Sequence, residues 1–329
     1  MKLVRTLSGH VENIKPIWMM RQAGRYLPEY RTLRERFPSF MEFCLNQEMA
    51  VQATLQPIQR FDFDAAIAFS DILVIPHFLG QKVHFKEGVG PILENPDWQK
   101  ILNSSVRDDI QVVYRIIADV RKELDPQKAL IGFVGCPWTI ASYMISAGKT
   151  IKFEGLVDFV KTWPFFSALM NKLIEVIADH AVGQLRAGAN IVQLFESWAA
   201  AVPKNFQREW LFDPAEKIVQ RIRRGVPEAN IIYYGKGVAL EALGALDHLG
   251  VGFGISQEAS LSDFSDTATC LQGNLDPEKL LDGNFEADVL AILEFAKDRP
   301  FIVNLGHGIL PKTPISHVER FVALVRGRG

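Results

Sequence analysis

The chain has 329 residues, with 36 Lys and Arg against 38 Asp and Glu, and its formal net charge is −2. This balance lacks the basic excess that is typical of nucleic-acid-binding proteins, so we expect no nucleic-acid partner. Hydrophobic residues make up 48% of the chain and charged residues 22%, which indicates a globular protein and excludes the disordered and collagen-like classes.

The cysteines and the uncharged stretches bear on the compartment. Cys44, Cys136 and Cys270 form no CxxC pair, which predicts reduced thiols in a reducing environment. The N-terminal residues contain no apolar run of the kind found in signal peptides. The longest uncharged stretch, residues 129–148, is interrupted by glycine and proline, which favours a strand and a loop over a membrane span. We therefore expect a cytoplasmic protein with no membrane partner.

Short, continuous apolar runs recur along the whole chain. Such runs are typical of parallel strands that are buried on both faces of a sheet. Eight are found, at residues 17–20, 65–69, 130–134, 191–195, 231–234, 251–255, 269–272 and 301–305.

Helical patterns separate these runs. Apolar residues at three- and four-residue spacing predict helices over 106–124 and 169–185, Asp213 before Pro214 predicts an N-cap, and Ser316 with Glu319 predicts a capping box. Eight strands that each lead into a helix predict a single (β/α)8 TIM barrel over residues 1–329, with the active-site cleft at the C-terminal ends of its strands. The alternative is an open, doubly wound sheet, but no glycine-rich dinucleotide or phosphate loop follows any strand.

In a barrel of this kind the catalytic residues follow the strands, so the residues after each run are the candidates. They are Arg21 and Arg25, Asp71, Tyr143, Ser197, Lys236, Asn274 with Asp276, and His307, in the order of the strands.

The arginines indicate the charge of the ligand. A guanidinium group binds a carboxylate or phosphate through two parallel hydrogen bonds, so a mouth that collects arginines predicts a substrate with several anionic groups. Arg21 and Arg25 directly follow an apolar strand, whereas Arg36 lies further on and is better explained as a solvated surface charge.

Asp71 and His307 each allow two interpretations. Arginines nearby favour the ionised form of Asp71, which would then only accept hydrogen bonds, either from ligand N–H groups or around a developing cation. The other interpretation of Asp71 is a cap on the following helix. His307 lies between glycines, where the backbone can approach a ligand closely, but a structural histidine is an equally good explanation.

Several segments together resemble one known family. PIWMMRQAGRYLPEYR (16–31) and GFVGCPWTIASY (132–143) are similar to the two signatures of uroporphyrinogen decarboxylases, and DAAIAFSDIL, QLFESWA, LQGNLDP and NLGHGI follow the family's order. The resemblance spans nearly the whole chain. It implies a TIM-barrel homodimer that decarboxylates the four acetate side chains of uroporphyrinogen III to methyls, giving coproporphyrinogen III, without a metal or an organic cofactor.

The resemblance also implies residue roles. Arg21 and Arg25 would bind substrate carboxylates, Asp71 would accept hydrogen bonds from the pyrrole N–H groups, and the proton donor would be Arg21, Arg25, Tyr143 or a water. The remaining contacts would be the backbone of Gln22, Ala23 and Gly24, the side chains of Tyr143, Ser197 and His307, and Phe40 as an apolar wall.

Some residues depart from the family pattern, and two other functions remain open. GISQEAS stands where many members carry an Asp-Trp pair, Cys136 replaces a smaller residue, and Ala200 replaces a glycine. One alternative is a zinc- and corrinoid-linked methyltransferase, which would need His and Cys metal ligands at a spacing that this chain lacks. The other is a non-catalytic tetrapyrrole-binding protein, which the joint presence of Asp71, Arg21 and Arg25 disfavours.

Overall fold

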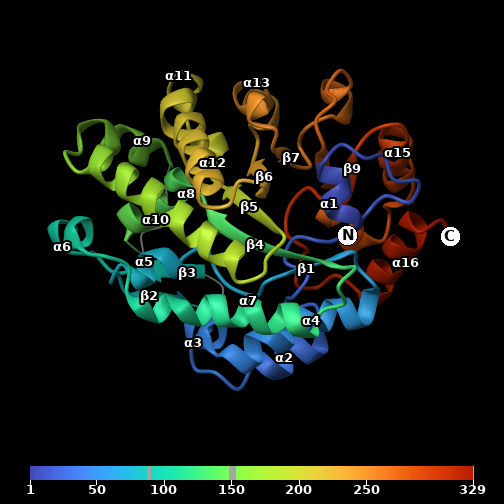
Figure 1. Ribbon diagram of the computed structural model, residues 1–329, viewed down its shortest axis with the longest axis horizontal. Helices are drawn as coiled ribbons and strands as arrows, with labels where there is room; N and C mark the ends of the chain where they lie inside the picture. Colours follow the sequence, from blue (N-terminus) through green and yellow to red (C-terminus); the bar gives the residue numbers. More distant parts are fainter. Residues whose placement is uncertain (87–89, 148–152, 329) are drawn as a thin grey trace.

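The computed structural model describes residues 1–86, 90–147 and 153–328. Within these residues, parallel strands form one curved sheet with helices packed around it (Figure 1). The predicted α/β barrel class is confirmed. The seven strands of this sheet follow one another in chain order: β1 (Ala65–Ile67), β4 (Ala129–Gly135), β5 (Ile191–Glu196), β6 (Asn230–Gly235), β7 (Gly252–Gly254), β8 (Leu271–Leu275) and β9 (Phe301–Leu305).

The first predicted strand is reduced to a single bridge. Ile17 pairs with Val303 of β9, and the amide of Trp18 donates to the Val303 carbonyl at 3.3 Å. On its other side the Ile17 carbonyl accepts from the amide of Asp64, just before β1, at 2.9 Å. The segment therefore lies between β9 and the start of β1 and takes the place of the eighth strand.

Helices follow the strands and cover the outside of the sheet (Figure 1). Four single turns of 3-10 helix, η1 (Asp108–Ile110), η2 (Ala199–Ala201), η4 (Asp247–Leu249) and η5 (Leu261–Phe264), and a π turn, η3 (Arg208–Phe212), are also described. The α-helices in the described residues are α1 (Lys2–Leu7), α2 (Pro28–Arg34), α3 (Phe40–Leu45), α4 (Gln47–Phe61), α5 (Val74–Phe78), α6 (Trp98–Asn103), α7 (Gln111–Glu123), α8 (Pro137–Ser146), α9 (Phe153–Thr162), α10 (Phe166–Arg186), α11 (Lys204–Gln207), α12 (Asp213–Gly225), α13 (Ala239–Leu246), α14 (Pro277–Asp282), α15 (Glu286–Ala296) and α16 (Ile315–Val325).

Two predicted helix starts are wrong. Asp213 has helical backbone angles because the π turn η3 runs directly into α12, so Asp213 is not an N-cap. Helix α16 begins at Ile315, with its first turn closing on the Pro314 carbonyl, so Ser316 lies inside the helix and caps nothing. The sequence also gave no sign of the antiparallel hairpin of β2 (Val83–Lys86) and β3 (Gly90–Leu93), which is inserted between β1 and β4.

Side chains that point into the barrel form a core of their own. Alternate residues of each strand contribute to it, as with Ile131 on β4 and Ile232 on β6, and helix α1 inserts Leu3 from the N-terminal end. A second, larger core lies between the strands and the surrounding helices. The inner core therefore fills the barrel between its two ends.

A chain of hydrogen bonds crosses the barrel interior. The Trp18 indole donates to Gln272 Oε1 at 2.9 Å, and Gln272 Nε2 donates to Gln193 Oε1 at 3.1 Å. All three residues are buried, so these bonds compensate for the cost of removing polar groups from water. They also connect the closing segment to β8 and β5.

No helix among the described residues is both long enough and apolar enough to cross a membrane. That residues 1–329 form one domain remains a prediction, which a single cooperative unfolding transition would support.

Candidate active site

Arg21 enters the mouth of the barrel on a constrained piece of backbone. It has a positive φ of 62°, a conformation that is uncommon for a residue with a side chain. The preceding residue is fixed to the loop after β9: the Met20 amide donates to Asn304 Oδ1 at 3.0 Å, and its carbonyl accepts from the Ile309 amide at 3.0 Å. The side chain then lies against Gly308, where an added Cβ would come within 2.4 Å of Arg21 Cδ. Gly308 therefore leaves the space that Arg21 occupies.

Arg21 and Arg25 are both exposed, and neither has a carboxylate within 4 Å in the described part of the chain. The neighbouring arginines are used differently. Arg31 donates to the carbonyl of Arg25 at 2.8 Å, and Arg34 donates to the carbonyl of Phe37 at 2.6 Å. These two therefore stabilise the loop, while Arg21 and Arg25 are available to an anion.

Asp71 follows β1 and is only partly exposed. Its Oδ1 accepts from the amide of Leu73 at 2.8 Å, which closes a local turn before α5. Helix α5 has Leu73 as its N-cap and no side-chain capping bond, so the interpretation of Asp71 as a helix cap is wrong. Burial raises the pKa of Asp71 to about 6, although this amide and the charge of Arg21 act in the opposite direction. Asp71 is therefore mostly ionised at neutral pH, as expected. Burial nevertheless has a larger effect on its pKa than Arg21 has, so the carboxyl titrates only about one pH unit below neutral.

Tyr143 lies on α8 and belongs to the same cluster. Its ring makes an edge contact with Trp198 at 6.1 Å, and the Trp198 side chain also hydrogen-bonds its hydroxyl. Burial raises the pKa of Tyr143, and the charges of Asp71 and Arg21 both act on it. Arg21, Asp71 and Tyr143 thus come together from three different strand ends.

His307 completes this cluster from the loop after β9. Burial, together with the charges of Arg21 and Lys236, lowers its pKa to about 4 against the opposing effects of Glu258 and the Gly308 backbone. The imidazole is therefore neutral at neutral pH. A neutral imidazole can accept one hydrogen bond and donate another, which suits a ligand that carries both carboxylates and N–H groups.

The other predicted contacts lie around this cluster. Gln22 is fully buried and its side chain accepts from the Met19 amide and donates to the Ala65 carbonyl, so it serves the barrel closure and leaves only its backbone to the mouth. Ala23, Gly24 and Ser197 are partly exposed. Phe40 packs edge-on against Phe85 at 4.7 Å and Phe69 at 5.9 Å, which agrees with an apolar wall and with simple packing.

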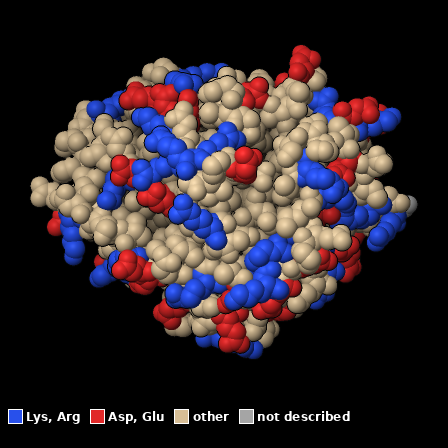
Figure 2. All heavy atoms as spheres, viewed as in Figure 1, with Lys and Arg blue, Asp and Glu red and all other residues tan. Residues whose placement is uncertain are grey.

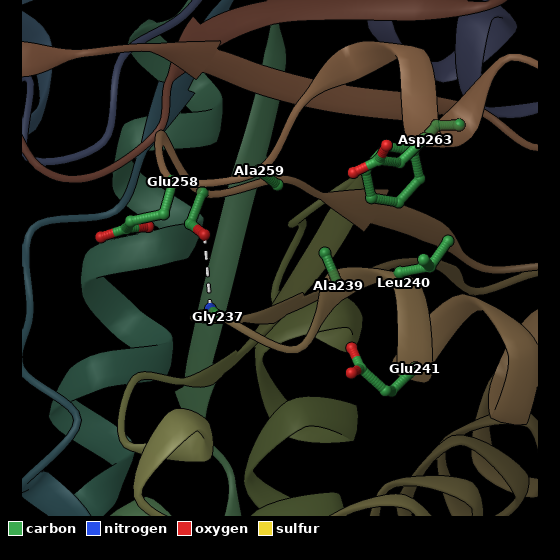
Figure 3. A pocket seen from close by; sticks show the side chains of 9 residues that line it. Gly237, Ala239, Leu240, Glu241, Glu258, Ala259 and Asp263 are labelled. Atoms are coloured by element: carbon green, nitrogen blue, oxygen red, sulfur yellow. Dashed lines mark hydrogen bonds between the residues drawn. The ribbon is translucent and has the colours of Figure 1, made fainter.

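A cavity of about 230 Å³ adjoins the mouth between the loops after β6 and β7 (Figure 3). Gly237 and Ser256 lie on its two sides and are joined by a hydrogen bond from the Gly237 amide to Ser256 Oγ at 3.3 Å. Ser256 begins the SQEAS stretch that departs from the family's Asp-Trp pair, so the shorter hydroxyl group here holds the two loops together.

Comparison with known proteins matches residues 1–328 to the family model of uroporphyrinogen decarboxylase. The uroporphyrinogen decarboxylases of Brucella melitensis biotype 2 and Brucella suis biovar 1 are each 40% identical to this chain, over 99% of it and 98% of their own length. This chain belongs to the uroporphyrinogen decarboxylase family. The predicted family is thereby confirmed, and with it the enzyme class.

Among solved structures, a methyltransferase from Methanosarcina mazei superimposes with a TM-score of 0.78 over 99% of this chain and 97% of its own. Its sequence identity is 18%, so it supports the barrel fold alone. Within residues 1–86, 90–147 and 153–328, no group of three or more His, Cys, Asp or Glu side chains is placed to hold a metal ion.

Two features of this barrel were given no role by the sequence analysis. Phe133, Phe195 and Tyr234 form a row of rings across the top of the inner core, with centroid distances of 5.8 Å between neighbours, and the first two are partly exposed. The alternation of side chains along a strand could have shown that these rings point inward. Phe133 lies two residues after the inward-pointing Ile131, and Phe195 lies two residues after Gln193. Tyr234 links this row, which we call the aromatic floor, to the polar cluster, because its hydroxyl donates to the carbonyl of Gly306 beside His307.

The second feature is the buried Glu196 at the end of β5. Its Oε1 accepts from the Thr139 amide at 2.8 Å and from the Thr139 hydroxyl, so it caps the N-terminus of α8 from a neighbouring strand. Burial raises the pKa of Glu196 to about 8. The Trp138 indole also donates to the Trp198 carbonyl at 3.1 Å. This bond holds helix α8, which carries Tyr143, against the loop that carries Ser197.

Proposed function

We propose that the chain converts uroporphyrinogen III to coproporphyrinogen III in tetrapyrrole biosynthesis, and that Asp71, Arg21 and Arg25 are its catalytic residues. The observation that carries this proposal is the cluster of Arg21, Asp71, Tyr143 and His307, which four strand ends bring together beside the aromatic floor. Membership of the family supports the reaction, and the chemistry of the cluster supports the roles.

The substrate has the groups that this mouth can bind. Eight carboxylates surround a macrocycle whose four pyrrole N–H groups point inward. Arg21 and Arg25 bind side-chain carboxylates as bidentate donors, while Asp71 accepts from the pyrrole N–H groups. The flat rings rest on Phe133 and Phe195. The backbone of Gln22 to Gly24, with Ser197 and Phe40, lines the edge of the cleft.

The reaction follows from this arrangement. A proton first adds to a ring carbon of one pyrrole, which creates an iminium-like cation directly beside Asp71. The bond between the acetate methylene and its carboxylate then breaks, CO₂ leaves, and the electron pair moves into the ring. The methylene carbon takes a proton and the ring carbon releases one, so each acetate consumes one proton net and becomes a methyl group.

The protein's contribution is electrostatic. A carboxylate that is already fixed by the Leu73 amide stabilises the developing cation without reorganising, and this is worth most where water is partly excluded. The proton donor is one of Arg21, Arg25, Tyr143 or a bound water. Burial raises the pKa of Tyr143, so its hydroxyl remains protonated and able to donate at neutral pH.

The deciding experiment is an anaerobic incubation of the protein with uroporphyrinogen III, followed by oxidation and chromatography of the porphyrins, with and without a strong chelator. We expect products with seven, six, five and four carboxylates in succession, unaffected by the chelator. An unchanged substrate peak would refute the proposal and direct attention to methyl transfer or to binding without turnover.

We also propose that the protein acts as a cytoplasmic homodimer, which the family resemblance supports. Sedimentation equilibrium should give twice the mass of the 329-residue chain, and a monomer mass across the accessible concentration range would contradict this.

A further inference from the structure

Lys236 is a cation at the mouth that the mechanism above does not use. It directly follows β6, and the ladder between β5 and β6 continues to it because its amide donates to the Glu196 carbonyl at 3.1 Å. Its own carbonyl accepts from the Ala200 amide at 3.1 Å. The backbone of Lys236 is therefore held through both its amide and its carbonyl, as in a strand.

The direction of its side chain follows from the strand. Tyr234, two residues earlier, points into the barrel, and its hydroxyl donates to the Gly306 carbonyl at 2.8 Å. Because strand side chains alternate, Lys236 projects on the same side as Tyr234, one step nearer the mouth. Gly306 directly precedes His307. The Lys236 ammonium is close enough to lower the pKa of that imidazole, as does the charge of Arg21.

The ammonium group has no protein anion as a partner. In the described ranges no carboxylate lies within 4 Å of it, although the side chain is partly buried. Lys204, on the nearby helix α11, is different: it is 87% exposed and pairs with Glu241 at 3.6 Å. The charges that act on the His307 imidazole are those of two cations, Arg21 and Lys236, and of one opposing carboxylate, Glu258, so the positive charge there favours binding of a further anion.

We propose that Lys236 and Arg21, together with His307, form a binding site for a substrate carboxylate that is not being decarboxylated in that turnover. This inference rests on the proposed function. It assigns a specificity role to a residue that stands outside the Arg21–Arg25 pair.

Lysine suits this position better than a third arginine. Four acetates react in turn at one catalytic centre, so the macrocycle must bind in several orientations, and a given flanking site meets arms of different length. An ammonium on a flexible stem is a point charge that accepts a carboxylate from several directions, whereas a guanidinium fork demands one geometry. Lys236 can thus follow the changing substrate while Arg21 stays fixed.

The test uses the Lys236→Met variant, the conservative Lys236→Arg variant and the control Lys204→Met. We expect Lys236→Met to raise KM for uroporphyrinogen III about tenfold, since one charge-assisted contact is lost, with kcat changed less than twofold. Lys236→Arg should recover most of the KM, and Lys204→Met should match the wild type. A KM within twofold of wild type in Lys236→Met, or an equal rise in Lys204→Met, would overturn the proposal.

Two readouts do not depend on turnover. The first is binding of uroporphyrin I, the oxidised eight-carboxylate porphyrin, followed by fluorescence; we expect about tenfold weaker binding in Lys236→Met alone. The second is the NMR titration of His307, assigned with His307→Gln, whose neighbours are Arg21, Lys236, Glu258 and the Gly308 backbone. Its pKa should rise in Lys236→Met.

These readouts separate the two proposals. The wild type and all variants could fail to decarboxylate the substrate while porphyrin binding still depends on Lys236. In that case the carboxylate site stands and the decarboxylase proposal fails. Normal turnover with porphyrin binding that is indifferent to Lys236 would refute the site alone.

Discussion

The charged side chains considered at the two ends of the barrel differ in whether they form ion pairs. At the N-terminal end, Asp64 is 14% exposed in its side chain and pairs with Lys2 at 3.4 Å and with Arg326 at 2.9 Å. Nearby, Lys128 pairs with Asp62 at 2.7 Å. These pairs join the first helix, the residues before β1 and the C-terminal helix, so charge at this end holds distant parts of the chain together.

At the C-terminal end, Arg21, Arg25 and Lys236 have no carboxylate within ion-pair distance among the residues described. Over the face shown in Figure 2, basic and acidic side chains are interspersed, as the net charge of −2 suggests. The pairs at the N-terminal end thus join distant parts of the chain, whereas the cations at the mouth are available to bind an anionic ligand.

The largest expected effect comes from Asp71. Asp71→Asn keeps the shape of the side chain and removes its charge, so the cationic intermediate loses its stabilising carboxylate. We expect decarboxylation to fall by about 10³-fold, to near the limit of detection, while the variant still folds. Single-turnover rates measure this, and Asp64→Asn at the paired end serves as the matched control. Wild-type rates in Asp71→Asn would show that the Asp71 carboxylate is not needed for decarboxylation.

Arg21 tests the electrostatics of the mouth through pH. Since only ionised Asp71 can work, kcat/KM of the wild type should fall below about pH 6, the pKa of that carboxyl. Arg21 lowers the pKa of Asp71, so Arg21→Met should move this acidic limb to higher pH and reduce kcat/KM by about 100-fold. Arg31→Met, which loses only hydrogen bonds to the carbonyls of Arg25 and Tyr26, should leave the position of the limb unchanged. An acidic limb at the same pH in Arg21→Met would contradict the coupling.

Glu196 tests a buried carboxyl that has no cation beside it. Glu196→Gln reproduces the neutral acid and should keep activity within about threefold, whereas Glu196→Ala removes the cap on α8 and should cost at least tenfold through a displaced Tyr143.

Glu196 also has a signature in stability. The folded pKa of about 8 lies above the ordinary value, so the folded protein retains a proton that the unfolded chain has lost. The free energy of unfolding should therefore fall by about 1 kcal/mol per pH unit between pH 6.5 and 8. Asp71 and His307 also titrate near the lower end of this window, because the folded pKa of Asp71 is about 6 and an unfolded histidine titrates near its ordinary value, so the contribution of Glu196 is isolated by the difference from Glu196→Gln. Denaturant titrations of wild type and Glu196→Gln should differ in this slope, and equal slopes would indicate that Glu196 is ionised when folded.

The smallest effect is expected at the paired end. Asp64→Asn should lower the free energy of unfolding by about 1–2 kcal/mol because two cations lose their partner, while kcat and KM stay unchanged. Asp62→Asn, at a side chain that is 71% exposed, should cost less than about 1 kcal/mol. A loss of activity in Asp64→Asn would contradict the view that charge at the N-terminal end serves stability alone.

The parts of the fold that could be predicted are those that local pattern dictates. Strands such as β4, β5 and β9 are continuous apolar runs, so their positions and the residues that follow them were correct to within a residue or two. The candidate site followed from this, because strand ends share one end of a barrel. The hairpin of β2 and β3 was missed because its short strands are largely exposed and have no such run.

What could not be predicted depends on distant parts of the chain. The pKa of Asp71 is set mainly by burial, which no sequence window reports, and so the influence of Arg21 was overweighted. Only the backbone of Gln22 was expected at the cleft, and the part its side chain plays in the barrel closure depends on Met19 and on the distant Ala65. Lys236 was noticed only as a strand end, because its neighbour His307 follows β9, which lies three places along the sheet from β6.

The closing segment has a consequence for how the protein is made. Residues 16–18 find their partners at Val303 and, through Trp18, at Gln272, so the barrel is closed by contacts between the first and last parts of the chain. Such long-range contacts form late and slow the folding rate. Arg21 and Arg25 lie immediately after this segment. A nascent chain that has not yet produced β9 therefore cannot assemble the anion-binding mouth, and the tetrapyrrole can be recognised only once synthesis is nearly complete.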